Sequence, residues 1–176
     1  MRPAHHRQKT TLRNSFLELP LFLLIFGVAC ASMLVPALHG FAVNDHGTSQ
    51  AFLYAGVLGL VAFSLIAIAH AGRAPRHGTL GPLMSLLSAF VFLPVMLALP
   101  FVEALPTTRF VNAYFEMVSA ITTTGAAMFQ EPGRLSPTLH LWRAQVGWMG
   151  GLLMWVAASA ILAQLHLGGF EVTSPA

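Results

Sequence analysis

Charged residues are scarce in this sequence. Only 9% of its 176 residues are Asp, Glu, Lys or Arg, whereas 56% are hydrophobic. A soluble domain carries about 25% charged residues, so this chain has too few charged side chains to cover a surface that faces water. The shortage excludes an ordinary soluble domain and predicts a membrane protein.

Cysteine and the usual signatures of catalysis are missing as well. Cys30 is the only cysteine, which excludes an intrachain disulfide and a metal–thiolate cluster. The eight histidines are scattered, and none forms an i, i+4 pair of the kind that holds a metal on one helix. No nucleophile stands beside a base, and no glycine-rich phosphate loop occurs. We therefore expect no enzyme, no metal site and no cofactor.

Long apolar runs dominate what is present. Four segments approach or exceed the roughly 20 residues that cross a bilayer core. They cover residues 19–38, 51–71, 81–102 and 138–165, and Pro94 is expected to kink the third. The first run follows a basic leader and contains the small residues of "GVACASM", a pattern that a signal peptide shares. It continues without a charge to Leu38, however, which favours a membrane span.

The loops between these segments predict an orientation. Basic residues precede the first segment and recur at Arg73 and Arg76, before the third, whereas the loop between the first two has Asp45 and no Lys or Arg. Positive charge marks the cytoplasmic side. Both termini are therefore expected in the cytoplasm, and we interpret the basic clusters as topology signals rather than as a nucleic-acid site.

Residues 103–137 remain on the outer side, and they contain an apolar segment that is too short to cross. Twelve helical residues at 110–121 reach about 18 Å, whereas the hydrocarbon core is about 30 Å thick. The segment is predicted to enter the membrane, stop near its middle and return through "TTTGAAMFQ", as a re-entrant hairpin. The alternative is an ordinary outer loop with an interfacial amphipathic helix.

The composition of the return suits a cation. Backbone carbonyls that point at a cavity can replace the water shell of a monovalent ion, and Gly125 permits the backbone angles that aim them. The neighbouring threonines are stiff at χ1 and add hydroxyl acceptors. Glu116 is expected to pack behind the loop, hydrogen-bonded to backbone N–H groups, because a lipid-facing carboxylate is costly.

The last apolar segment carries two further candidates. Gly147 and Gly151 are four residues apart, a spacing that lets membrane helices approach closely. They are interpreted as a helix-packing pair, against the alternative of glycines placed by chance. Arg143 is expected to reach outward, to pair with Glu131 or to contact lipid phosphates.

Together these stretches resemble a known family. The pattern "FEMVSAITTTGA", followed by "LWRAQVGWMGG" and "LGGFEV", resembles the TrkH/KtrB family of bacterial potassium-uptake proteins. The resemblance implies an all-α protein of the bacterial inner membrane, with four transmembrane helices, one re-entrant pore helix and a filter-like loop. It divides the chain into a basic cytoplasmic leader (1–18), a two-helix hairpin (19–72), one pore repeat (81–165) and a cytoplasmic tail (166–176).

The resemblance also implies roles for particular residues. Thr123, Thr124, Gly125 and Ala126 would present their carbonyls to a transported K⁺, with Thr122 and Glu116 as support. A cytoplasmic nucleotide-binding subunit would be a candidate regulatory partner, beside the lipid bilayer itself. Ala127 departs from the hydroxyl residue that is common in the family.

The serious departure is that family pores contain four such repeats, whereas this sequence holds one. Three interpretations stay open: the N-terminal part of a split or truncated transporter, an assembly of four copies, or a retained fragment in another membrane complex. We therefore predict a contribution of one filter loop to a potassium-uptake pore. The alternative is a non-transporting accessory subunit.

Overall fold

The computed structural model describes residues 21–70 and 81–166, and every regular element within these ranges is a helix. The helices are α2 (Leu21–Ser32), α3 (Leu34–Ala42), α4 (His46–His70), α5 (Gly81–Ala104), α6 (Phe110–Ile121), the 3-10 turn η2 (Pro132–Arg134) and α7 (Pro137–His166). The predicted leader at 1–18 and nearly all of the tail at 166–176 lie outside the described residues, as does the basic loop at 71–80.

Three stretches are long and apolar enough to cross a membrane, and they confirm that the first three predicted segments form such helices. They run over Leu21–Ala42, His46–His70 and Leu83–Ala104. Helices α2 and α3 make up the first and are separated only by a turn at Met33. Helix α7 has 30 residues, but it is not among these three stretches. Its crossing of the membrane, and with it the fourth span, stays a prediction.

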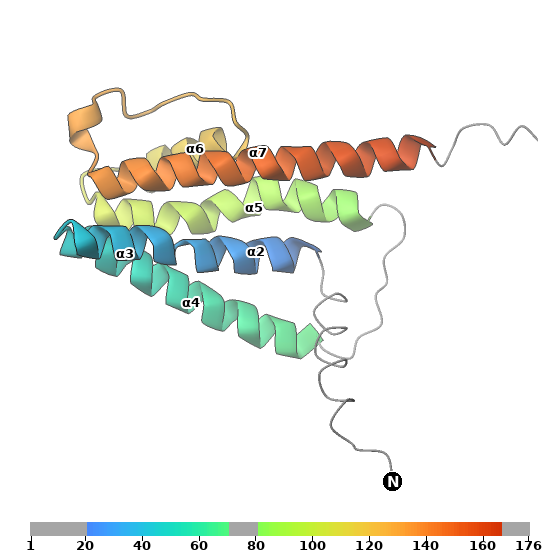
Figure 1. Ribbon diagram of the computed structural model, residues 1–176, viewed down its shortest axis with the longest axis horizontal. Coiled ribbons are helices and arrows are strands. Elements are labelled where there is room, and N and C mark those ends of the chain that lie inside the picture. The colour runs from blue at the N-terminus through green and yellow to red at the C-terminus, as the bar shows by residue number, and fades with distance from the viewer. Residues whose placement is uncertain (1–20, 71–80, 167–176) are drawn as a thin grey trace, which may run out of the picture.

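The long helices lie side by side, and successive ones run in opposite directions (Figure 1). Helix α6 packs against α5 and α7 at one end of the bundle. From its C-terminal end, the chain returns as a loop to the end of the bundle where α6 began (Figure 1). The short helix and its return therefore form a hairpin that enters and leaves on the same side.

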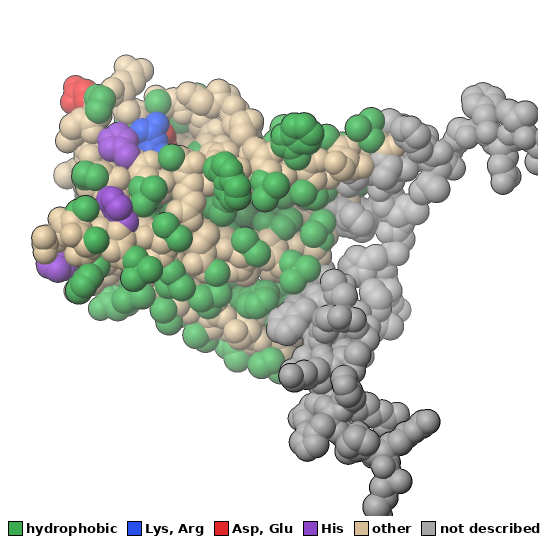
Figure 2. Space-filling model, viewed as in Figure 1, with side chains coloured by type: hydrophobic (Ala, Val, Ile, Leu, Met, Phe, Trp, Pro, Cys, Tyr) green, Lys and Arg blue, Asp and Glu red, His purple; other side chains and the backbone are tan. Residues whose placement is uncertain are grey.

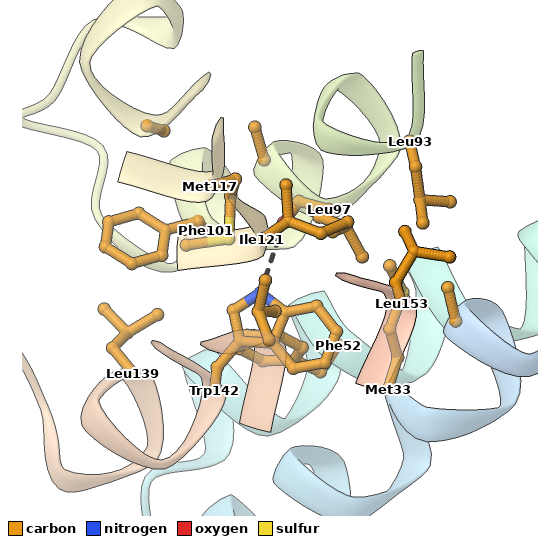
Figure 3. Packing of buried hydrophobic residues seen from close by; sticks show 14 of the residues in the cluster. Met33, Phe52, Leu93, Leu97, Phe101, Met117, Ile121, Leu139, Trp142 and Leu153 are labelled. Atoms are coloured by element: carbon orange, nitrogen blue, oxygen red, sulfur yellow. Dashed lines mark hydrogen bonds between the residues drawn. The ribbon is translucent and has the colours of Figure 1, made fainter. Parts of the chain in front are cut away.

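Bulky side chains from four helices fill the core where α6 and α7 meet α4 and α5. The Phe52 and Trp142 rings meet edge to face with their centroids 5.2 Å apart, and neither is exposed. The Trp142 indole N–H donates to the carbonyl oxygen of Leu97 at 3.2 Å (Figure 3). Met117 and Ile121 of α6 pack above this pair (Figure 3). The core thus fixes the short helix to the spanning helices.

The surface agrees with a lipid environment. Large hydrophobic side chains are exposed along most of α4, and Leu58 and Ile68 are 69% and 72% exposed. On the face in Figure 2, hydrophobic side chains cover the flanks, whereas the coloured charged and histidine side chains gather at the end that holds η2. An extended exposed apolar surface of this kind marks a region that a membrane or a partner covers.

Candidate functional site

The hairpin loop (residues 122–128) starts with a turn that holds a threonine in a left-handed conformation. The N–H groups of Thr124 and Thr123 donate to the carbonyl oxygens of Ser119 and Ala120, each at 3.0 Å. This pair of bonds is a Schellman motif, in which glycine usually occupies the left-handed position. Here Thr123 occupies it with φ of 55°. A β-branched residue there stores about 1–3 kcal/mol of strain, which points to a functional constraint.

Three consecutive carbonyls of the loop are free to bind a ligand. Within the described part of the chain, no N–H or hydroxyl donates to the carbonyl oxygens of Thr123, Thr124 or Gly125. Gly125 has φ of 76°, and residues 123–128 are all exposed. The Ala126 carbonyl differs, because it accepts a hydrogen bond from the Ser119 hydroxyl at 2.6 Å. Of the four carbonyls that were predicted to face an ion, three accept no hydrogen bond, and that of Ala126 bonds a side chain of α6.

The threonine hydroxyls brace the loop against the end of α6. The Thr122 hydroxyl donates to the Val118 carbonyl oxygen at 2.7 Å and lies 2.8 Å from the Thr124 hydroxyl. A hydroxyl has one proton to donate, so Thr124 is the donor in the second bond. This chain of hydroxyls ties the loop to the last turn of the helix.

A buried carboxylate joins the loop to both neighbouring helices. Glu116 of α6 is 2% exposed, and its Oε2 accepts a hydrogen bond from the Met128 N–H at 2.8 Å. Its Oε1 lies 2.6 Å from the Arg143 guanidinium of α7. Both oxygens of the carboxylate are thus engaged. Through these two contacts the Glu116 carboxylate holds the return of the loop in place. Removing either charged partner would leave a buried charge uncompensated.

Glycine lets α7 approach the end of α6 closely. A Cβ added to Gly150 would lie 2.7 Å from the Cα of Ile121, which requires a shift of backbone. A Cβ added to Gly147 would lie 3.9 Å from the Ala120 carbonyl oxygen, whereas one added to Gly151 would meet no atom within 4 Å. The close approach therefore rests on Gly150, which sequence reasoning did not single out.

A polar cavity of about 360 Å³ lies between the hairpin loop and the N-terminal half of α7. The loop side contributes Thr123 and Gly125, and α7 contributes His140 and Arg143. The His140 ring also bonds the Pro132 carbonyl oxygen at 3.0 Å, which anchors the far end of the return. A polar space of this size can hold water next to the loop.

A further bond fixes α6 to α5 beside a proline. The Tyr114 hydroxyl donates to the carbonyl oxygen of Val91 at 3.2 Å, three residues before Pro94. The Trp142 indole N–H likewise donates to the carbonyl oxygen of Leu97, three residues before Pro100 (Figure 3). Proline removes the helical hydrogen bond of the carbonyl four residues before it, and these side-chain donors from neighbouring helices bond the next carbonyl along α5.

The class that these features define is a helical membrane protein with a clamped half-length helix and a loop of free carbonyls. Comparison with known proteins narrows this class to a group of related sequences. The chain is 43% identical over 75 residues to the Trk system potassium uptake protein TrkI of Halomonas elongata, a match that covers 43% of this chain and 15% of that protein. It is 40% identical over 63 residues to TrkG of Escherichia coli, covering 36% and 13%. TrkH of Halomonas elongata is 38% identical over 88 residues, covering 50% and 17%.

The chain is thus a homologue of Trk system potassium uptake proteins over about 43% of its length. It spans only 13–17% of the length of the relatives named above. No family model matches, and no solved structure matches. The relatives carry the names of uptake proteins and not of enzymes, in agreement with the predicted lack of enzyme activity.

Sequence reasoning missed two contributors to this site. Arg143 was expected to reach outward or to pair with Glu131, but its partner is Glu116. Gly150 was passed over in favour of Gly151. A signal did exist for the ion pair, because a buried glutamate in a membrane needs a cation and Arg143 is the first basic residue of the last apolar segment.

Proposed function

We propose that this chain contributes one selectivity-filter segment to a K⁺ permeation path through a bacterial inner membrane. The observation that carries the proposal is the row of three free carbonyls, on Thr123, Thr124 and Gly125, at the end of a half-length helix. Homology to proteins named for potassium uptake supports the choice of ion.

In this proposal the carbonyl oxygens take the place of water around the ion. The Schellman turn and the Glu116 clamp hold the loop rigid, so little ordering is left to be done when the ion arrives. A single segment covers one side of an ion. The remaining oxygens must come from other membrane subunits, from further sequence or from further copies of this chain.

The proposal also places the hairpin in the membrane. Helix α6 has 12 residues, or about 18 Å of length. It would enter from the periplasmic side and end near the middle of the bilayer, with both termini of the chain in the cytoplasm. The polar cavity beside the loop would then keep the Arg143 guanidinium hydrated at that depth.

Two matched glycines provide the test. Cells that lack this chain are supplied with the wild type, Gly125→Asp or Gly133→Asp, and ⁸⁶Rb⁺ uptake is measured at low external K⁺. Both glycines are exposed and an added Cβ meets nothing at either, but only Gly125 has a left-handed φ. Gly125→Asp should abolish the uptake that depends on the chain, and Gly133→Asp should preserve it. Normal uptake with Gly125→Asp would contradict the proposal.

A second candidate function is that of a non-transporting accessory subunit. The observation that favours it is that the described residues hold a single loop of this kind. In that case, loss of the chain should lower the abundance of a partner complex, and Gly125→Asp should restore that abundance as well as the wild type does. A cytoplasmic nucleotide-binding partner belongs to the first function, and co-purification with the intact chain would test for it.

A further inference from the structure

A second cavity, of about 370 Å³, opens on the flank of the bundle between α2, α5 and α7. None of its lining residues is charged, and only Ser32 and Gln145 are polar. The Ser32 hydroxyl donates to the Ala29 carbonyl oxygen at 2.7 Å, and the Gln145 side-chain amide donates to the Ser32 carbonyl oxygen at 2.8 Å. Both polar side chains thus donate to backbone carbonyl oxygens, and hydrocarbon groups line the wall of the cavity.

The mouth of this flank cavity lies among residues that face outward. Val28, Trp148 and Leu152 line it and are 64%, 71% and 56% exposed. The face that carries α2 and α7 shows hydrophobic side chains over this region, with charged ones only at the end near η2 (Figure 2). The cavity is therefore continuous with the part of the surface that hydrocarbon covers in a membrane.

The size of the residues at the mouth distinguishes a lipid from another helix. Membrane helices pack on each other through small residues that let their backbones approach. On α7, Gly147 lines the polar cavity, Gly150 packs on α6, and Gly151 does not line the flank cavity. The mouth of the flank cavity is bordered instead by the larger side chains of Val28, Trp148 and Leu152. Flexible methylene chains fill such an uneven wall, whereas a helix needs a flat or small-residue surface.

We propose that the flank cavity binds one acyl chain of a membrane phospholipid. The inner wall of the cavity includes Ile121, the last residue of α6, which is 1% exposed and directly precedes the hairpin loop. The bound chain packs against the end of the short helix at Ile121, which does not line the polar cavity. The acyl chain thus fills space in the flank cavity that no protein side chain fills.

Fluorescence quenching tests this binding directly. The full chain is stripped of lipid in detergent and titrated with phosphatidylcholine whose acyl chains carry bromine, which quenches tryptophan on contact. Trp148 lines the cavity, whereas Trp155, although 78% exposed, does not. We expect saturable quenching that Trp148→Phe removes and Trp155→Phe retains. Quenching that never saturates, or that both variants reduce equally, would overturn the proposal.

A pair of matched substitutions supplies the second arm. Val28→Phe narrows the mouth and should weaken the saturable quenching severalfold, while Val61→Phe, at a 50% exposed site on α4, should leave it unchanged. If Trp148 is protected while Trp155 is quenched, protein fills the cavity and the proposal fails. The titration needs no ion transport, so its result and that of the uptake experiment are independent.

Discussion

The N-terminal hairpin (residues 21–70) and the C-terminal hairpin (residues 110–166) are held together in different ways. In the first, α2 and α4 meet through small residues and thiol or thioether side chains. A Cβ on Gly56 would lie 3.2 Å from the Met33 Cβ, and one on Gly59 would lie 2.5 Å from the Cys30 Sγ. Most of these contacts are apolar, and the side-chain ends at Gly59 can move.

In the C-terminal hairpin, α6 and α7 also share the apolar core, but polar bonds hold the loop between them. Glu116 bonds both the Arg143 side chain and the Met128 N–H, and hydroxyls tie the loop to α6. Within lipid, apolar contacts between helices gain little over contacts with hydrocarbon, whereas an unpaired polar group is costly. The difference teaches that apolar fit can join two helices of spanning length, while an irregular loop is held by polar partners.

The clamp should give the largest effect. Glu116→Gln leaves the Arg143 cation without its partner and should lower the free energy of unfolding by about 3 kcal/mol. That figure is the lower end of the range for buried pairs, because Arg143 keeps 25% exposure. Thermal unfolding in detergent measures the loss. Glu131→Gln, at an exposed acid without such a contact, is the control and should change little.

A double replacement sharpens the same point. Glu116→Met combined with Arg143→Met removes both charges and should recover most of the stability that the single variant loses. The loop would then be held by the backbone bonds of the Schellman turn and by its hydroxyl bonds. A single-variant loss no larger than that of Glu131→Gln would mean that polar bonds do not hold the C-terminal hairpin.

Gly150 and Gly59, the tightly packed glycines of the two hairpins, should differ in how well they tolerate an added methyl group. Gly150→Ala drives a Cβ into the backbone of Ile121 and should cost about 1–3 kcal/mol. Gly59→Ala meets the ends of the Cys30 and Met96 side chains, so it should cost less. Gly151→Ala meets nothing within 4 Å and should be neutral or favourable by up to about 1 kcal/mol, because alanine is the better helix former. Equal losses at Gly150 and Gly59 would remove the distinction.

The left-handed threonine should give a smaller change of opposite sign. Thr123→Gly relieves a strained φ of 55°, a gain of about 1–3 kcal/mol. Glycine offsets about 0.5–1 kcal/mol of this gain, because it makes the unfolded chain more flexible. We expect a modest net rise in unfolding temperature, whereas Thr124→Gly, which relieves no such strain, should lower it. A stability loss from both would show that the turn is unstrained.

The sequence predicts the helices of both hairpins far better than their contacts. The short helix at 110–121 was expected at the residues where it occurs, because Arg109 and the Thr122 run bound a short apolar segment. Its re-entry into the membrane stays a prediction. Helix bounds follow from composition along the chain, which a sequence displays directly.

The contacts depend instead on how helices rotate about their axes. Gly150 and Gly151 differ by about 100° around α7, and only packing decides which of them meets α6. The same packing brings Arg143 to Glu116, although Glu131 is nearer in sequence. The left-handed Thr123 had no signal at all, because glycine is the residue that normally marks such a position.

The smallest expected effect concerns the turn of the N-terminal hairpin, where Asp45 caps α4. Its Oδ1 accepts a hydrogen bond from the Thr48 N–H at 3.3 Å. Burial by itself would raise the pKa of Asp45, but hydrogen bonds with Thr48 and Ser136, together with the nearby His46, outweigh it and lower the pKa below its ordinary value. Asp45→Ala should cost about 1 kcal/mol through loss of the cap, and Asp45→Asn less, because asparagine caps as well.

The lowered pKa of Asp45 gives this cap a dependence on pH with a definite sign. A depressed folded pKa means that the carboxylate contributes stability above its unfolded value of about 3.9, and that the contribution is lost as pH falls through the folded pKa. Unfolding temperatures of the wild type and Asp45→Asn, measured from pH 7 down to pH 3, should therefore converge in acid. A gap that stays constant or widens toward pH 3 would mean that the charge of Asp45 does not stabilise the turn, and that this hairpin rests on apolar contacts even where it leaves the membrane.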